Sequence, residues 1–576
     1  TTWLPPKITH LTNPPVEYVV TKPEYVRNDS AGNELQYQAG MYGSCSHLSP
    51  PYGYWCSAHP NRTVDGSLTH RWPSGLTWKN YLPNAPYKNA NGNAVVHSCR
   101  GGANCWFTWQ FKVDGFFENG TLTFGEGGTQ GAEGSDTGGV WYIEGVMEEL
   151  DAPREYYFDN TTGKLYYVHN DTVGTPPPPS MVFEAVEKRV LFDLVGSQTD
   201  PIKNVTISNL VLRDTRSTFF DPHGLPSAGD WGLERVGAVR ANGVEFFTLD
   251  NCLLTRMDSH GVSLNGYTRN VTISNNEMSW LGASGITAWG KTKQGVGGGN
   301  VSIPEEWGVG IDGTGGTQPR YTTVENNNIR EIGIFQKQSS AFFQAQSCQT
   351  TIVNNVFFNG PRALINFNDQ FGGENVIKRN LLFNAVRETA DHGPFNSWGR
   401  QPYVTKLRYG YPSITPADTE IFENFVLGSY NTQEAIDNDD ASEHFKTHKN
   451  VFVYGGGGLK SDFGGHSNQH YDNIYAFVGG GCVGVNSFVK QNEDGFYRNV
   501  CIMQTDGKSY AGFDCNSPPN LNSNKIYSPN GTTFEMCGMP WQEYQNKTGN
   551  DLNSTISPWP ESSKILEWMN TTLKIN

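Results

Sequence analysis

A short apolar segment built around an asparagine recurs along the chain between residues 205 and 503. It reads VTISNLVL around Asn209, TIVNNVFF around Asn354 and YRNVCIM around Asn499. Val, Ile, Leu, Phe and Thr dominate these segments and nearly alternate with polar residues, a pattern that predicts β-strands. The recurring asparagines are Asn209, Asn251, Asn275, Asn326, Asn354, Asn380, Asn424, Asn450, Asn473 and Asn499.

The spacing of these asparagines predicts the fold. Successive ones are 42, 24, 51, 28, 26, 44, 26, 23 and 26 residues apart. Steps of 23 to 28 residues are too short for helical repeats but fit a coil of two or three strands. The longer steps represent two coils, or one coil with an inserted loop. We therefore predict an all-β, right-handed parallel β-helix (a solenoid), in which the asparagines stack as a ladder at a turn.

The two ends of the chain lack this repeat. We expect residues 1–190 to form a β-rich cap or accessory region, with a hairpin that turns at residues 160–163. Residues 191–508 form the predicted β-helix. We expect residues 509–576 to be a disulfide-containing tail with a helix at SSKILEWMNTTL (residues 562–573), which caps the open end of the solenoid.

The charge composition argues against nucleic-acid binding. Charged residues are 17% of the chain, against about 25% in average soluble proteins, and the net charge is −15. We therefore expect no basic surface for nucleic acid. The sequence has no run of 18 apolar residues, so we expect no membrane-spanning helix.

Cysteines and glycosylation motifs indicate a secreted, extracellular protein. Cys45 with Cys56, Cys99 with Cys105, and Cys515 with Cys537 are candidate disulfide couples, whereas Cys252, Cys348, Cys482 and Cys501 lie singly in the middle. The sequence contains no Cys-x-x-Cys motif, so we expect neither a zinc ribbon nor a thioredoxin site. Twelve Asn-x-Ser/Thr motifs predict N-linked glycans. They are Asn28, Asn61, Asn119, Asn160, Asn170, Asn204, Asn270, Asn300, Asn530, Asn546, Asn553 and Asn570.

Acidic residues recur at one phase of the coil, about 11–16 residues after the asparagines. Asp437 and Asp439 would share a strand face, and Asp462 lies 23 residues after Asp439, which is one coil. Asp391 lies 46 residues before Asp437, which we interpret as two coils. Carboxylates packed in one groove raise one another's pKa values, as glycoside hydrolysis requires of its general acid. Alternatives for Asp437 to Asp440 are a solvated turn or a calcium site; we expect no other metal or cofactor.

Polar and aromatic residues around Asp391 could bind a sugar. The sequence ADHGPFNSWGR supplies candidates for hydrogen bonding to hydroxyls and for stacking on a sugar ring. The expected substrate-binding residues are Asp369, Asp391, His392, Asn396, Trp398, Arg400 and Asp440.

Several stretches together resemble a known family. RALINFNDQFGGENVIKRN, DHGPFNSWGR and AIDNDDASEHF with GGGGLK are similar to the β-helix glycosidases of glycoside hydrolase family 141 and their uncharacterised relatives. The resemblance runs from about residue 125 to 480. It implies fucosidase- or xylanase-like activity on complex polysaccharides, and it carries site roles onto Asp391, His392, Asn396, Trp398 and Arg400, and onto Asp437, Asp439 and Asp440. Ala441 departs from the family's Gly, and the segment around Asp462 departs from its Lys-x-Arg-Glu-Gly-like run.

We thus expect a secreted glycoside hydrolase that acts on a cell-wall or algal polysaccharide, with Asp437, Asp439 and Asp462 as catalytic carboxylates. One alternative is a polysaccharide lyase. Another is a non-catalytic structural glycoprotein of an extracellular surface or filament, which would self-associate. A third is glycan binding without catalysis.

Overall fold

The computed structural model describes much of the chain from residue 76 onward. The described residues are 76–77, 94–99, 108–116, 121–127, 141–147, 150, 154–169, 176–221, 223–224, 233–290, 293–294, 311–312, 317–368, 373–398, 417–428, 433–439, 442–461, 465–486 and 493–575. Among them, no helix is long and apolar enough to cross a membrane.

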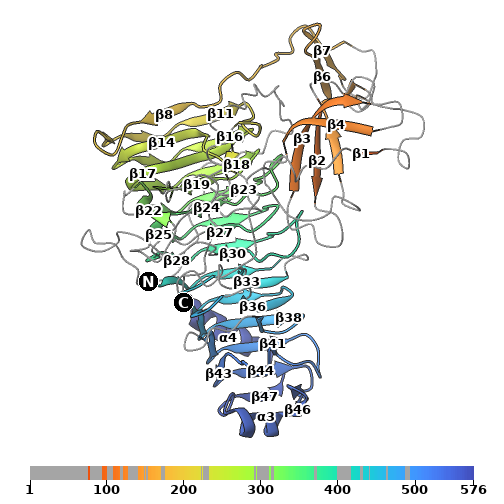
Figure 1. The fold of residues 1–576 in the computed structure, drawn as a ribbon, viewed down its shortest axis with the longest axis vertical. Helices are drawn as coiled ribbons and strands as arrows, with labels where there is room; N and C mark the ends of the chain where they lie inside the picture. Colours follow the sequence, from red (N-terminus) through yellow and green to blue (C-terminus); the bar gives the residue numbers. More distant parts are fainter. Residues whose placement is uncertain are drawn as a thin grey trace.

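The predicted parallel β-helix is confirmed. Each coil contributes strands to three faces, and strands one coil apart pair in parallel (Figure 1). The first face holds β9 (Ile202–Lys203), β10 (Thr206–Ser208), β15 (Thr248–Asp250), β22 (Pro319–Glu325), β25 (Cys348–Val353), β28 (Val376–Lys378), β31 (Thr419–Phe422), β34 (Phe445–His448), β37 (Gln469–Tyr471), β40 (Gly495–Tyr497) and β43 (Asn520–Asn522). The second face holds β11 (Val211–Thr215), β16 (Leu253–Met257), β18 (Glu277–Leu281), β23 (Asn328–Arg330), β26 (Val356–Phe358), β29 (Leu381–Phe383), β32 (Phe425–Leu427), β35 (Val451–Val453), β38 (Ile474–Val478), β41 (Val500–Met503), β44 (Lys525–Ser528) and β47 (Thr555–Pro558).

The third face carries the acidic segment. It holds β8 (Phe192–Val195), β19 (Ile286–Trp289), β24 (Phe342–Ala345), β27 (Ile365–Asn368), β30 (Phe395–Trp398), β33 (Glu434–Asn438), β36 (Gly457–Ser461), β39 (Val483–Val485) and β42 (Ala511–Phe513). Two long strands, β14 (Gly237–Glu245) and β17 (His260–Ser274), run from the third face into the first. Short antiparallel pairs are β12 (His223–Gly224) with β13 (Leu233–Glu234), β20 (Lys293–Gln294) with β21 (Ile311–Asp312), and β45 (Glu535–Met536) with β46 (Met539–Pro540).

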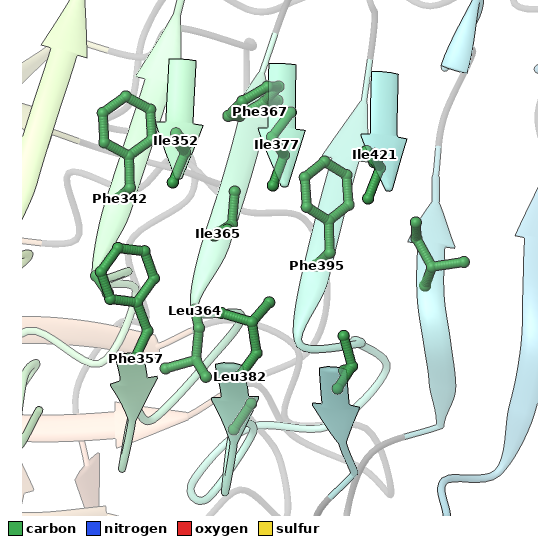
Figure 2. Packing of buried hydrophobic residues seen from close by; sticks show 14 of the residues in the cluster. Phe342, Ile352, Phe357, Leu364, Ile365, Phe367, Ile377, Leu382, Phe395 and Ile421 are labelled. Carbon is green, nitrogen blue, oxygen red and sulfur yellow. The ribbon is translucent and has the colours of Figure 1, made fainter. Parts of the chain in front are cut away.

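Inward-pointing side chains stack from coil to coil along the core (Figure 2). Phe342, Ile365 and Phe395 occupy the same register on β24, β27 and β30. Ile352 and Ile377 do the same on the first face. All five are buried. The alternation read from the sequence places apolar residues inside because strand side chains alternate between two faces.

A buried asparagine ladder follows the corner between the first and second faces. Asn355 Oδ1 accepts hydrogen bonds from the backbone N (2.9 Å) and Nδ2 (3.1 Å) of Asn327, and Asn355 donates in the same way to Asn380. These bonds satisfy backbone groups that the turn leaves without strand partners. The ladder consists of Asn276, Asn327, Asn355, Asn380, Asn424, Asn450, Asn473, Asn499 and Asn524.

The predicted ladder positions were wrong by one residue in the early coils. Asn275, Asn326 and Asn354 each lie one residue before a ladder asparagine. Asn209 and Asn251 precede the ladder in the chain, and Asn251 Nδ2 donates to Asn209 Oδ1 (2.6 Å). These five positions have φ between 51° and 58°. Asparagine tolerates this left-handed conformation, so two adjacent positions both favour it.

The N-terminal part is β-rich. Antiparallel strands form a sheet in the order β1-β4-β3-β2-β5, with β1 (Leu76–Thr77), β2 (Val95–Cys99), β3 (Thr108–Phe116), β4 (Thr121–Gly127) and β5 (Trp141–Glu144). A hairpin follows, with β6 (Tyr156–Asp159) and β7 (Lys164–Tyr167) turning at residues 160–163 as predicted. The sheet lies beside the early coils, where Val95 packs with Phe219 and Phe220 (Figure 1).

The C-terminal segment closes the far end of the solenoid and also runs back along its side. The stacked strands continue past residue 508 as far as β47. Helix α3 (Trp541–Thr548) lies at the end in Figure 1, and Tyr544 packs in the main core. Helix α4 (Ser562–Leu573) forms where predicted, but it packs on the second face, where Ile565 and Leu573 contact a cluster with Val451 and Ile474.

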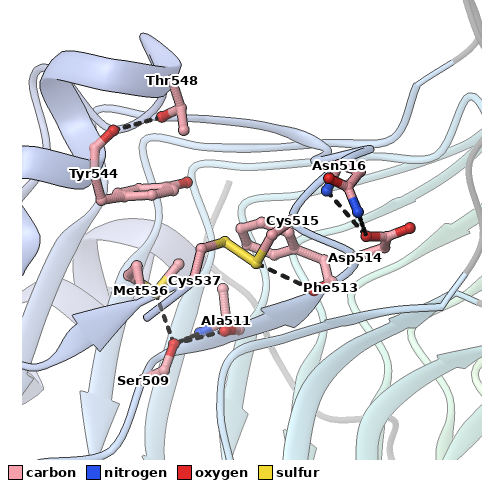
Figure 3. The surroundings of a disulfide bond; sticks show 10 residues. All are labelled: Ser509, Ala511, Phe513, Asp514, Cys515, Asn516, Met536, Cys537, Tyr544 and Thr548. Atoms are coloured by element: carbon pink, nitrogen blue, oxygen red, sulfur yellow. Dashed lines mark hydrogen bonds between the residues drawn. A yellow bond between two sulfur atoms is a disulfide. The ribbon is translucent and has the colours of Figure 1, made fainter. Parts of the chain in front are cut away.

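Two disulfides lie in the described residues. Cys515–Cys537 is the predicted couple and joins the segment after β42 to the β45–β46 turn (Figure 3). Cys482–Cys501, between the third and second faces, was not expected. Cys252 and Cys348 are buried free thiols. Cys45, Cys56 and Cys105, and the side chain of Cys99, fall outside the described residues.

Candidate active site

The candidate site lies on the outer side of the third face, across four neighbouring coils. Asn366, Asn396, Asp437 and Lys460 occupy one register row on β27, β30, β33 and β36. Their neighbours in sequence, such as Phe367, point into the core. Because side chains alternate along a strand, this row faces outward. Nevertheless Asn366, Asn396 and Asp437 are each 0% exposed, so the row is a covered polar layer.

A buried arginine organises the first half of this layer. Arg362 Nη1 donates to Oδ1 of Asn366 (2.9 Å) and of Asn396 (3.1 Å). Its Nη2 contacts Nε2 of His392 at 2.5 Å, and its guanidinium lies 5.1 Å from the centre of the Trp398 ring. A buried guanidinium requires such partners. Arg362 therefore fixes the orientation of both amides and of His392.

Two aspartates converge on one lysine. Lys460 Nζ lies 3.0 Å from Oδ1 of Asp439 and 3.4 Å from Oδ1 of Asp437. The other oxygen of Asp437 accepts a hydrogen bond from Asn396 Nδ2 (2.7 Å). The backbone N of Asp439 donates to the carbonyl of Ser397, which holds the segment after β33 against β30. The side chain of Asp439 is 16% exposed and that of Asp437 is fully buried.

Burial and crowding raise the pKa values of two carboxyls. The pKa of Asp437 lies well above its usual value because of burial and the nearby Asp439, Glu434 and Asp391, although Lys460 opposes the shift. Burial, Asp391 and Asp439 raise the pKa of Glu434 to about 7, again against the effect of Lys460. Glu434 is partly exposed, and its Oε2 has no hydrogen-bond partner among the described residues. The site thus combines neutral carboxyls with an aspartate paired to a lysine.

His392 is held neutral. Burial, Arg362 and Lys460 lower its pKa well below the usual value, against the opposing effect of Asp439. Its Nδ1 lies 3.4 Å from Oγ1 of Thr389. A neutral imidazole beside a guanidinium acts as a hydrogen-bond acceptor, so His392 supports Arg362.

Asp391 lies closer to the acidic cluster than predicted. The strand that follows Asp391, β30, pairs directly with β33, so Asp391 and Asp437 are one coil apart and not two. Residues 399–416, which follow β30, lie outside the described residues. Asp391 has φ of 66° and is partly exposed, and it raises the pKa values of Glu434 and Asp437.

The other predicted site residues divide into two groups. Trp398 is fully buried, so its ring is covered rather than presented for stacking on a sugar. Asp369, Arg400, Asp440 and Asp462 lie outside the described residues. The β33–β36 register sets Lys460, and not an acid, opposite Asp437.

Sequence reasoning missed three members of the cluster. Arg362 and Lys460 stand inside stretches that carry the family resemblance, RALINFN and GGGGLK, but neither was singled out. Glu434 begins β33, three residues before Asp437. A search for basic residues at the phase of the acids would have found Lys460, because a buried carboxylate needs a partner.

Most sequons in the described residues lie at the surface. Asn160 is partly exposed. The exposed ones are Asn204, Asn270, Asn530, Asn546, Asn553 and Asn570. Asn28, Asn61, Asn119, Asn170 and Asn300 lie outside the described residues.

Comparisons with known proteins agree with the architecture. A family model described as "Right handed beta helix region" matches residues 237–405. Together with the stacked coils, this match defines a right-handed parallel β-helix protein. No curated protein matches the chain.

Two solved structures are similar at 11% identity. One, titled "Glycoside hydrolase", has a TM-score of 0.44 over 80% of this chain and 70% of its own. The other, "The complex structure of XylC with xylose", has a TM-score of 0.33 over 66% of this chain and 62% of its own. Both likenesses are too distant to bear on activity.

Proposed function

We propose that the chain is a glycoside hydrolase whose carboxylates act on the outer side of the third face. The observation that supports this is the cluster around Lys460, where Asp439 pairs with the lysine while Asp437 and Glu434 carry raised pKa values. Glycoside hydrolysis uses such a pair, in which one carboxyl donates a proton and one carboxylate acts as nucleophile or base.

The roles follow from charge and exposure. Asp439 is the carboxylate, because it is partly exposed and its lysine partner favours the ionised form. Glu434 is the proton donor, because a pKa of about 7 keeps part of it protonated at neutral pH and the residue is partly exposed. Burial, together with Asp391 and Asp439, keeps the pKa of Glu434 high, while Asp437 lies buried between Asn396 and Lys460. Asp462 remains a further candidate carboxylate.

The supporting polar layer would orient these groups. Arg362 fixes Asn396, and Asn396 fixes Asp437 by hydrogen bonding. A site held by such bonds loses little free energy to reorganisation during reaction. We assign substrate contact to Asp391, at the exposed edge of the cluster, and retain Arg400 and Asp440 as candidates. Trp398 acts as a packing partner of Arg362.

The substrate and the compartment are also proposals. We propose a complex cell-wall or algal polysaccharide, on the strength of the resemblance to fucosidase- and xylanase-type enzymes. Disulfides persist in oxidising compartments. The two described disulfides and the exposed sequons therefore support secretion as an N-glycosylated protein.

Saccharide release tests the proposal. Purified protein would be incubated with fucosylated, xylan, pectic and algal polysaccharides, and products identified by mass. Asp439→Asn and Glu434→Gln should each lower the rate by at least about a hundredfold. Unsaturated products that absorb in the ultraviolet would instead indicate a lyase. Polymeric assemblies without turnover would favour a structural glycoprotein.

A further inference from the structure

A second cluster lies at the corner that leads from the third face into the first. One ligand atom from each of Glu443, His444 and His466 lies within 4.8 Å of the others. Glu443 and His466 belong to neighbouring coils and pair through an isolated parallel bridge. The side chains of Glu443 and His466 are 8% and 1% exposed, and that of His444 is 21% exposed. The cluster is therefore sheltered but reachable from solvent.

The hydrogen bonds around the cluster orient both imidazoles. His466 Nε2 lies 2.7 Å from Oε2 of Glu443, while its Nδ1 lies 3.2 Å from Oγ of Ser467. His444 Nδ1 lies 3.6 Å from Oδ1 of Asp418. Metal-ligating histidines commonly present one ring nitrogen to the ion and the other to a carboxylate or another polar group. Both rings have this arrangement, with Asp418 and Ser467 as outer partners.

The donor set favours one class of ion. Calcium prefers six to eight oxygen ligands, whereas two imidazoles with one carboxylate suit zinc and related divalent ions. A tetrahedral zinc ion with bonds of about 2.0–2.1 Å would hold its ligand atoms about 3.4 Å apart. Ligand atoms that lie up to 4.8 Å apart would therefore have to approach one another by at most about 1.4 Å.

We propose that Glu443, His444 and His466 bind a zinc-type divalent metal ion. The ion would tie neighbouring coils together just after the segment that carries Asp439. That segment is already linked to the cluster, because the backbone N of Ser442 donates to the carbonyl of Asp439 (2.9 Å). The metal site does not depend on the proposed hydrolase activity.

Direct metal titration tests the site. The full chain would be treated with chelator, dialysed, and titrated with zinc chloride by calorimetry and with cobalt chloride by visible absorption. We expect one equivalent of zinc to bind and cobalt to develop a tetrahedral absorption band, with calcium giving neither. His444→Gln and Glu443→Gln should weaken zinc binding by at least about tenfold.

A matched histidine elsewhere on the same strand region serves as control. His448→Gln, four residues further on, should bind zinc as the wild type does. Circular dichroism would confirm that each variant folds; if Glu443→Gln does not, the more exposed His444→Gln decides the outcome. The proposal is overturned if the wild type binds no zinc, or if His444→Gln binds it as tightly as the wild type.

Discussion

The asparagine ladder makes a sharp prediction because two adjacent asparagines differ only in position. Asn355 is 0% exposed, and its Oδ1 accepts hydrogen bonds from N and Nδ2 of Asn327. Its Nδ2 donates to the carbonyls of Val324 and Val353 and to the next ladder asparagine. Asn354 is only partly buried, with φ of 57°.

Replacing Asn355 by alanine would leave several buried groups without partners. Each costs about 1–3 kcal/mol, and the losses overlap, so we expect the free energy of unfolding to fall by about 3–5 kcal/mol. Asn354→Ala removes no such bond and should cost about 1 kcal/mol, through its left-handed backbone. Urea denaturation measures the loss of stability in both variants. If the chain does not refold, their unfolding rates are compared instead. Equal losses in the two variants would refute the ladder's energetic role.

Three further predictions concern charge and cross-linking. Because the pKa of Glu434 is raised from 4.5 to about 7, the folded state retains a proton that the unfolded chain releases, so stability should fall as pH rises from about 4.5 to 7. Glu434→Gln should abolish that part of the fall in urea titrations at several pH values; an unchanged profile would contradict it. Lys460→Met removes the charge that lowers the pKa values of Glu434 and Asp437, so the alkaline limb of the pH–rate profile should move up by about 1 unit. A downward shift would exclude Glu434 as proton donor. Replacing Cys515 and Cys537 by serine should lower the free energy of unfolding by about 3 kcal/mol, measured by denaturation, since their bridge spans 22 residues; no loss would argue against the bridge.

The sequence predicted the coils because their period and apolar alternation are strong, local signals. It misplaced early ladder positions because Asn354 and Asn355 occupy adjacent sites that both suit asparagine. It also counted the 46 residues from Asp391 to Asp437 as two coils, because the length of a segment does not show how many coils it spans. The pairing of β30 with β33 shows that the two residues are one coil apart.

The site was predicted in part. Placing Asp437 and Asp439 on one side of a strand needed only the alternation of side chains, and both do reach Lys460. The burial of Trp398 could not be foreseen, because it depends on contacts such as that with Arg362, far away in the sequence. For the same reason, sequence spacing did not suggest that Cys482 pairs with Cys501.

The carboxylate cluster around Lys460 is the central claim, and polysaccharide hydrolysis by wild type and Asp439→Asn side by side tests it most directly. We predict that the wild type releases saccharides from at least one polysaccharide of the panel. The Asp439→Asn variant, once circular dichroism has shown that it is folded, should release at least about a hundredfold less. Release that is equal in the two proteins would contradict the assignment of the reactive carboxylate. No release by either would contradict the hydrolase itself.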